Sequence, residues 1–248
     1  MEIIGSGFLA RHLAVLETDH PHVTALAAGV SRTIDVGQSA YQREAALLYE
    51  TIDDCRRLDR TLLFFSTASA SMYGGVGAPG REDGPVYPQS PYGHHKLALE
   101  TVVRLSGVRH LILRLGHVLG PDQPAHQMLP ILIGAVRSGR VEVHRGACRD
   151  LIDVADVVSA VDALLRADAL DEVVNVASGV AVPAESIVDH LELRLGGPLE
   201  RRFVDRSSRY EVSLDKLSEL TRGKAGQPFP EDYYKGVIDA CLESAPGS

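Results

Sequence analysis

Short runs of apolar and β-branched residues alternate along the chain with longer segments whose apolar positions recur at helical spacing. The runs expected to form strands are Met1–Ile4, His22–Val30, Thr61–Thr67, His110–Leu115, Val141–His144 and Val173–Ala177. The segments expected to form helices are Phe8–Leu16, Tyr41–Leu58, Pro91–Leu105, His126–Arg137, Val154–Ala167 and Ala184–Leu195, followed by a last helix from Glu231 to about Leu242. This alternation indicates βαβ units and predicts an α/β protein with a doubly wound, mostly parallel sheet.

Four clusters of proline and glycine separate these segments and are expected to be loops. They are Gly74–Pro91, Gly116–Pro124, Gly196–Pro198 and Gly223–Pro230. Loops at the carboxyl ends of parallel strands line the ligand crevice, so the first two are candidate walls of a site. We expect one domain over residues 1–248, with a cofactor-binding core in 1–119 and 141–177 and a small C-terminal substrate lobe from 120–140 and 178–248.

Composition excludes several classes of protein. Of the 248 residues 45% are hydrophobic, which suffices for a large core, and the net charge of −8 argues against general affinity for nucleic acid or anionic membranes. The longest apolar run, Met128–Val136, contains a proline and a glycine and is far shorter than the about 20 residues of a membrane helix. An apolar strand begins at Glu2 and leaves no room for a secretion signal, so we expect a cytoplasmic protein.

Neither disulfides nor a metal site are expected. Cys55, Cys148 and Cys241 are odd in number, widely spaced and without a CxxC pair. The ten histidines show no H-E-x-x-H pattern and no accompanying carboxylate cluster.

The segment Gly5–Ala10 follows the first strand, opens a helix and has the G-x-G-x-x-A form of a dinucleotide fingerprint. In such a turn the first glycine permits the tight bend, the second lets the backbone approach a pyrophosphate, and the small third residue allows close packing of helix on sheet. The alternative is an ordinary glycine turn between a strand and a helix.

The tip of the next strand decides which dinucleotide is expected. It reads Ala27-Ala28-Gly29-Val30-Ser31-Arg32 and carries no carboxylate for a ribose 2′-hydroxyl. Ser31 and Arg32 would suit a 2′-phosphate, because a guanidinium binds phosphate in a fork, so NADP(H) is favoured and NAD(H) is possible. The alternative is that Arg32 is a solvated loop charge.

A reactive pair begins the helix at Pro91. Ser90 suits the N-cap and Pro91 the first helical position, so Tyr92 and Lys96 lie four residues apart on one helix face. A tyrosine has an ordinary pKa near 10 and needs a nearby cation to act as an acid–base catalyst at neutral pH. Lys96 is placed to supply it.

A cluster of hydroxyl side chains ends the apolar strand before this helix, in Ser66–Gly74. A serine there could donate a hydrogen bond to a carbonyl oxygen as charge develops on it. By itself, a serine-rich strand end more often caps a turn than takes part in catalysis. The pattern Tyr-x-x-x-Lys by itself is an equally weak sign of catalysis, because it occurs by chance in many helices. The ordered series of fingerprint, serine strand and Tyr-Lys helix is more specific than any of its parts.

These motifs resemble the short-chain dehydrogenase/reductase superfamily, in its extended branch of NAD(P)-dependent nucleotide-sugar epimerases, dehydratases and reductases. The similar segments are Gly5–Leu13, Ser66–Gly74, Tyr92 with Lys96, Leu113–Pro121 and Arg149–Val158. The resemblance implies a Rossmann-like sheet, here shortened. It places Ser69, Tyr92 and Lys96 at the catalytic positions and Arg149 at a contact to a substrate diphosphate.

The motifs and the resemblance together assign the remaining contacts. Cofactor contacts are expected at Gly5, Ser6, Gly7, Phe8, Leu9, Ala28, Gly29, Val30, Ser31, Arg32, Thr67, Ala68, Tyr92, Lys96, Leu115, Gly116, His117 and Val118. Substrate contacts are expected at Ser69, Ser71, Met72, His117 and Arg149.

Two features depart from the family pattern. The chain is short between the first helix and the serine strand, and Leu26–Ser31 also resembles the family's later Leu-Ala-Ala strand. Two alternatives therefore stay open. In the first, Leu26–Ser31 ends the second strand of the family's sheet. In the second, the usual second and third strands are absent, and the argument for NADP(H) from Arg32 weakens. His117 also stands where a small or amide residue is frequent.

These features predict an NAD(P)H-dependent ketoreductase of a nucleotide-linked ketosugar or a similar ketone. One alternative is a nucleotide-sugar 4-epimerase or dehydratase with retained NAD, and another is a non-catalytic dinucleotide sensor or scaffold. The expected partner is a small molecule, with no nucleic acid and no membrane. A homodimer through Tyr41–Leu58 and Pro91–Leu105 is possible, although packing on the sheet explains their apolar faces equally well.

Overall fold

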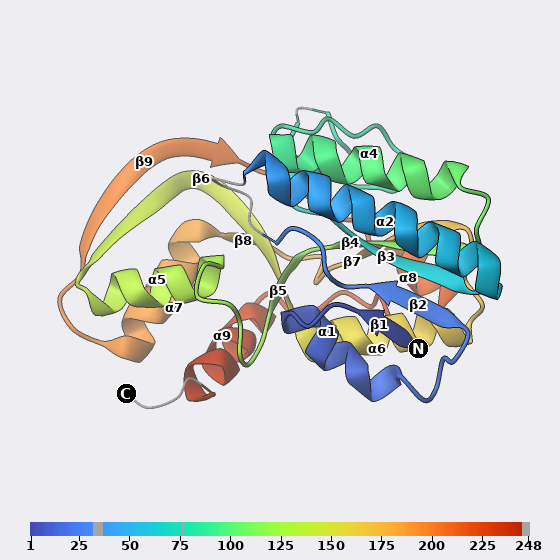
Figure 1. Cartoon of the computed structure of the whole chain (residues 1–248). Helices are drawn as coiled ribbons and strands as arrows, with labels where there is room; N and C mark the ends of the chain where they lie inside the picture. Colours follow the sequence, from blue (N-terminus) through green and yellow to red (C-terminus); the bar gives the residue numbers. More distant parts are fainter. Residues whose placement is uncertain (32–36, 76, 245–248) are drawn as a thin grey trace.

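The core is a parallel sheet of five strands with helices on both faces (Figure 1). A computed structural model describes residues 1–31, 37–75 and 77–244. The strands lie side by side in the order β1 (Glu2–Ile4), β2 (Val23–Leu26), β3 (Thr61–Thr67), β4 (His110–Leu115) and β7 (Glu172–Val176). Every neighbouring pair is parallel, which confirms the expected α/β class and Rossmann-like layering.

Two pairs of helices cover this sheet, one pair on each face (Figure 1). The helices α1 (Phe8–Leu13), continued by the short 3₁₀ turn η1 (Ala14–Leu16), and α6 (Val154–Arg166) lie on one face. The helices α2 (Gln38–Leu58) and α4 (Pro91–Leu105) lie on the other.

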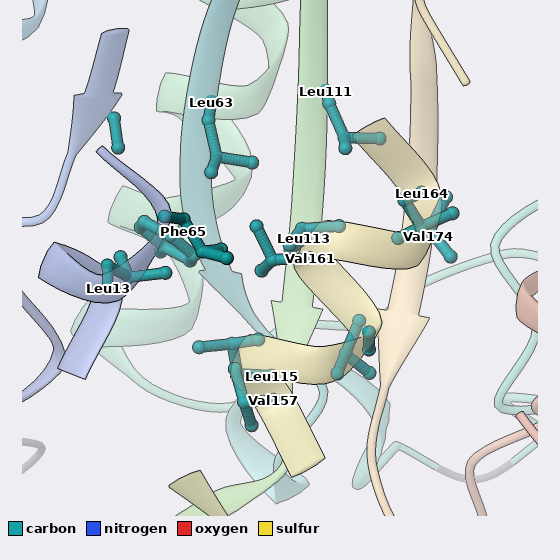
Figure 2. Close-up of a cluster of buried hydrophobic side chains, with 14 of the residues drawn as sticks. Leu13, Leu63, Phe65, Leu111, Leu113, Leu115, Val157, Val161, Leu164 and Val174 are labelled. Carbon is teal, nitrogen blue, oxygen red and sulfur yellow. The ribbon is translucent and has the colours of Figure 1, made fainter. Parts of the chain in front are cut away.

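Alternate side chains of each central strand enter opposite hydrophobic clusters. Figure 2 shows Leu63 and Phe65 of β3 on the side of α6, near Val161. Their chain neighbours Leu62 and Phe64 pack in the cluster under α2 and α4. Both faces of β3 are thus buried, and for this reason its sequence reads as a continuous apolar run.

Strand β1 lies at the edge of the sheet, directly beside β2. Ile3 pairs with Ala25 in this register. The order of the strands in the sheet follows their order in the chain, without reversal, and β2 is the one strand that the described residues form between α1 and α2. This arrangement agrees with the alternative in which the usual second and third strands are absent.

The first two crossovers pass over opposite faces of the sheet. Each of these connections leads to the next strand in the same direction across the sheet. However, α1 packs with α6 on one face of the sheet, whereas α2 packs with α4 on the other. The connections β1–α1–β2 and β2–α2–β3 therefore have opposite hands, although parallel crossovers are right-handed in about 98% of cases. The carboxyl ends of all the strands still meet at one edge of the sheet.

A second sheet forms the other end of the molecule, built on the long strand β6 (Arg140–Asp153) that arches away from the core (Figure 1). Its neighbours are β5 (His117–Leu119), β8 (Ala181–Pro183) and β9 (Glu200–Ser208). The expected strand Val141–His144 belongs to this sheet and not to the core sheet. The sequence predicted a strand there correctly, but a short apolar run does not reveal its partners.

Helices α5 (Met128–Arg137), α7 (Ala184–Leu195) and α9 (Tyr233–Glu243) pack against the second sheet. Strand β9 was not expected, because most of its residues are exposed and it lacks a continuous apolar face. The short helices α3 (Ala70–Tyr73) and α8 (Asp215–Leu220) complete the fold. In the part of the chain that the structure describes, no helix has both the length and the apolar character of a membrane span.

Candidate active site

A cavity of about 460 Å³ lies at the carboxyl ends of the core strands. Loops that follow parallel strands converge there, so segments far apart in the sequence share its wall. The expected site residues that line it are Gly7, Phe8, Leu9, Gly29, Val30, Ser31, Thr67, Ser69, Tyr92, Lys96, Leu115, Gly116, His117 and Val118. The three expected catalytic residues, Ser69, Tyr92 and Lys96, thus line one cavity.

Seven other expected contacts are not among the described residues that line the cavity. They are Gly5, Ser6, Ala28, Ala68, Ser71, Met72 and Arg149. Met72 is fully buried in a hydrophobic cluster. Arg149 donates from Nη1 to the carbonyl oxygen of Cys148 at 2.7 Å and to Oγ of Ser208 at 3.2 Å. Arg32 lies outside the described residues.

The wall also contains residues that the sequence did not suggest. They include His126 and Gln127, which follow the loop Gly116–Pro124, and Met128, the first residue of helix α5. The loop Gly116–Pro124 was expected to be a wall, but nothing in its pattern showed how far the wall continues. Ser31 meets this segment, with Oγ 3.3 Å from Nε2 of His126.

The glycine turn after β1 approaches the end of β2 closely and borders the cavity. Gly5 has φ +135°, and a Cβ there would lie 2.6 Å from the carbonyl oxygen of Ala27, so only glycine lets the end of β2 approach. A Cβ on Gly7 would meet nothing within 4 Å, and Gly7 lines the cavity where α1 begins without a side-chain cap. The glycines therefore leave room and free backbone N–H groups for a dinucleotide.

The start of α4 brings Tyr92 to the serine loop. Oγ of Ser90 accepts a hydrogen bond from the Gly93 N–H at 3.1 Å, as expected for an N-cap. A Cβ on Gly93 would lie 2.0 Å from the carbonyl oxygen of Ser71. Only glycine allows this approach of α4 to α3, which places Tyr92 beside the end of β3.

Ser69 is both a helix cap and a free hydroxyl donor. Its Oγ accepts from Oγ1 of Thr67 at 2.8 Å and from the N–H of Ser71 at 3.3 Å. Both contacts use lone pairs of Ser69, so its own O–H remains able to donate into the cavity. The two interpretations of the serine cluster are thus compatible.

Lys96 is held by a carboxylate that the sequence analysis did not identify. Its Nζ donates to Oε1 of Glu44 at 2.6 Å and to the carbonyl oxygen of Phe65 at 3.0 Å. Glu44 is only 2% exposed and comes from α2. A pattern could have revealed it, because Glu44 stands at helical spacing with Leu48 and Cys55 on the buried face of α2.

Opposing influences set the ionisation of Tyr92. Burial raises the pKa of Tyr92, the charge of Lys96 lowers it, and the charge of Glu44 raises it; the pKa ends above its ordinary value. Nζ of Lys96 is 5.9 Å from the centre of the Tyr92 ring. The expected lowering by Lys96 is present but outweighed, so Tyr92 is a protonated phenol at neutral pH.

A second polar cluster forms the wall near β5. The Tyr210 hydroxyl lies 3.3 Å from Nδ1 of His117 and accepts from the N–H of Asp150 at 3.1 Å. Burial, together with the charge of Arg149, lowers the pKa of His117 to about 3. His117 therefore presents a neutral imidazole, and Arg149 acts on the cavity through its charge without lining it.

Comparisons with known proteins concern the family and the fold of the chain. Residues 9–177 match the NAD dependent epimerase/dehydratase family. A dTDP-6-deoxy-L-talose 4-dehydrogenase (NAD(P)(+)) from Kitasatospora kifunensis is 34% identical over 140 residues, which are 50% of this chain and 43% of that protein. The chain spans about half the length of the curated relatives that it matches.

Solved structures show the same fold. A UDP-galactose 4-epimerase superposes with a TM-score of 0.80 over 99% of this chain and 100% of that one, at 21% identity. The structure of RMD from Pseudomonas aeruginosa complexed with NADPH superposes with a TM-score of 0.76 over 98% and 95% of the two chains, at 22% identity. At these identities the likeness concerns the fold.

Proposed function

Because the chain belongs to the NAD dependent epimerase/dehydratase family of short-chain dehydrogenase/reductase-type enzymes, we propose that it is an NAD(P)H-dependent ketoreductase of a nucleotide-linked ketosugar. The observation that carries this proposal is the convergence of Ser69, a protonated Tyr92 and Lys96 on one cavity beside the glycine turn. Reduction of a ketone requires an acid at the carbonyl oxygen, and Tyr92 is in the acid form.

Each catalytic side chain has a defined task. A bound nicotinamide cofactor supplies the hydride for the carbonyl carbon. The Ser69 O–H donates a hydrogen bond to the carbonyl oxygen as negative charge develops there, and Tyr92 delivers the proton. Lys96, fixed by Glu44 and by the carbonyl oxygen of Phe65, offers its positive charge to the phenolate that Tyr92 leaves.

The cofactor assignment covers both dinucleotides. Gly7, Phe8 and Ser31 line the cavity where the pyrophosphate and the adjoining ribose would lie. In the usual order 3-2-1-4-5-6 the first strand lies between the second and the fourth. Here β1 lies at the edge, and β2, which Ser31 follows, lies between β1 and β3. Strand β2 therefore corresponds better to the usual fourth strand than to the second, and Ser31 does not mark the tip of the second. We therefore propose that NADPH and NADH both serve, and the relative dissociation constants measure any preference.

Two observations support a nucleotide sugar as the proposed substrate. The relative from Kitasatospora kifunensis is named for a dTDP-linked 6-deoxy sugar and its 4-position. In this chain, Arg149 lies behind the His117 wall and places positive charge near that end of the cavity.

The test offers dTDP- and UDP-linked 4-ketosugars to the purified protein with NADPH or NADH. We expect one reduced sugar for each cofactor oxidised. Interconversion of UDP-glucose and UDP-galactose without net cofactor consumption would instead identify an epimerase. Loss of water from the sugar would identify a dehydratase, and failure to bind either dinucleotide would contradict every enzymatic interpretation.

A further inference from the structure

A buried carboxylate outside the Ser-Tyr-Lys set contacts the catalytic helix from a different element. Oε1 of Glu44 accepts from Nζ of Lys96 at 2.6 Å, and Oε2 accepts from the N–H of Val30 at 2.9 Å. Oε2 also lies 3.0 Å from Nε2 of His95. These three contacts of Glu44 reach the helix that carries Tyr92 and the loop after β2.

The backbone is shaped to admit this carboxylate. A Cβ on Gly29 would lie 2.5 Å from Oε1 of Glu44 and 3.0 Å from Nζ of Lys96. Gly29 and Val30 line the cavity, so the loop that would face a cofactor is anchored on the same carboxylate that holds Lys96. A buried ion pair of this kind is costly to desolvate and is weak evidence for stability, which leaves a functional role to be sought.

We propose that Glu44 is a positioning residue that fixes Lys96 and offsets its charge at Tyr92, so that Tyr92 is held as the phenol, which is the form that donates a proton in carbonyl reduction. This inference rests on the proposed function. A base that starts by oxidising an alcohol must be a phenolate, whereas an acid that completes a reduction must be a phenol. A negative charge next to Lys96 favours the phenol.

The surroundings of the pair are consistent with this role. The titratable groups that act on Tyr92 are Lys96 of the same helix and Glu44 and Tyr41 of α2. His95 faces Glu44, and its ring packs against that of Tyr41 at a tilt of 45°, with the ring centres 4.6 Å apart. Lys96 lowers the pKa of Glu44, with the Val30 N–H and His95 acting in the same direction; together they overcome the effect of burial and keep Glu44 ionised.

The test is an ultraviolet titration of tyrosine ionisation in the Glu44→Gln variant. Subtracting the titration of the Glu44→Gln, Tyr92→Phe double variant isolates Tyr92, and the same subtraction is made in the wild-type background. We expect Tyr92 to ionise about one to three pH units lower in the variant than in the wild type, the range typical of a neighbouring charge. An unchanged or higher value would overturn the proposal.

A second measurement uses catalysis. The turnover number (kcat) for alcohol oxidation, measured at saturating substrate and neutral pH, should rise at least severalfold in Glu44→Gln relative to the turnover number for ketone reduction. A matched control is Glu100→Gln, which removes the charge of a buried carboxylate in α4. Glu100 does not line the cavity; it accepts from Nη2 of Arg114 at 2.7 Å and from Oγ of Ser66. An equal change in the control would assign the effect to general loss of stability and overturn the proposal.

The two hypotheses fail in different ways. If wild-type protein reduces no ketosugar, the proposed function fails, while the titration still shows whether Glu44 controls Tyr92. If reduction occurs but the Tyr92 titration does not move, the function stands and the role of Glu44 is refuted.

Discussion

The Tyr210 hydroxyl lies 3.3 Å from Nδ1 of His117, and so the C-terminal segment reaches the wall of the cavity beside β5. The same hydroxyl accepts from the Asp150 N–H of β6. One phenol thus joins β5, β6 and the segment after β9, and it fixes the ring of His117.

We predict that Tyr210→Phe destabilises the protein and loosens this wall. The buried Asp150 N–H would lose its acceptor, at a cost of about 1–3 kcal/mol in the free energy of unfolding. Urea unfolding measures the cost, and Tyr49→Phe, at a side chain that is 56% exposed, is the control. A change no larger than that of the control would show that the hydrogen bond contributes nothing.

Tyr92→Phe should abolish most of the ketosugar reduction. Loss of a general acid lowers turnover by a factor of about 10² to 10⁴, while the glycine turn and the rest of the cavity wall are untouched. Initial rates measure the loss, and cofactor titration should give a dissociation constant close to that of the wild type. Tyr87→Phe, an exposed control, should be fully active; near-normal turnover of Tyr92→Phe would refute the role of Tyr92.

Gly29→Ala should reduce turnover more than it reduces stability. The new methyl group would displace Oε1 of Glu44 and Nζ of Lys96, which are ends of side chains and can move. We expect turnover to fall at least about tenfold, as small displacements of catalytic groups produce, with little change in melting temperature. Gly236→Ala in α9 is the control, because its Cβ would meet nothing within 4 Å. Equal activity of the two variants would contradict the prediction.

Asp150 should make stability depend on pH. Burial raises its pKa to about 6, although the N–H and hydroxyl of Ser178 and the N–H of Gly179 partly oppose this. A raised pKa means that the folded state holds the proton more tightly than the unfolded chain does. The resulting contribution of Asp150 to stability is complete below the pKa of the carboxyl in the unfolded chain and is lost as pH rises through about 6.

The free energy of unfolding of Asp150→Asn should therefore increase relative to that of the wild type as pH rises from acid to neutral. A shift of roughly two units corresponds to about 3 kcal/mol at most. Urea unfolding of both proteins across this pH range gives the difference, and the opposite contribution of His117 is common to both. Asp122→Asn, at an exposed position, should show no such trend, and a pH-independent difference for Asp150→Asn would contradict the prediction.

The sequence by itself determined most of the core elements and indicated the residues proposed here for catalysis. Local rules suffice for these features, since the fingerprint turn, the Ser90 cap and the four-residue spacing of Tyr92 and Lys96 are set by a few neighbouring residues. The buried strands β3 and β4 were also evident, because both faces of each are covered and their sequences are uniformly apolar.

Tertiary structure decided the partners of these elements. The strand at Val141 joined a second sheet, and β2 took the place next to β1, because strand pairing depends on contacts between segments far apart in the chain. The same dependence on contacts between distant segments explains why the sequence did not reveal the contact of Glu44 with Lys96. Its helical position predicts only that it faces the interior, whereas the packing of α2 against α4 brings its carboxylate to Lys96 and thereby sets the charge of the site.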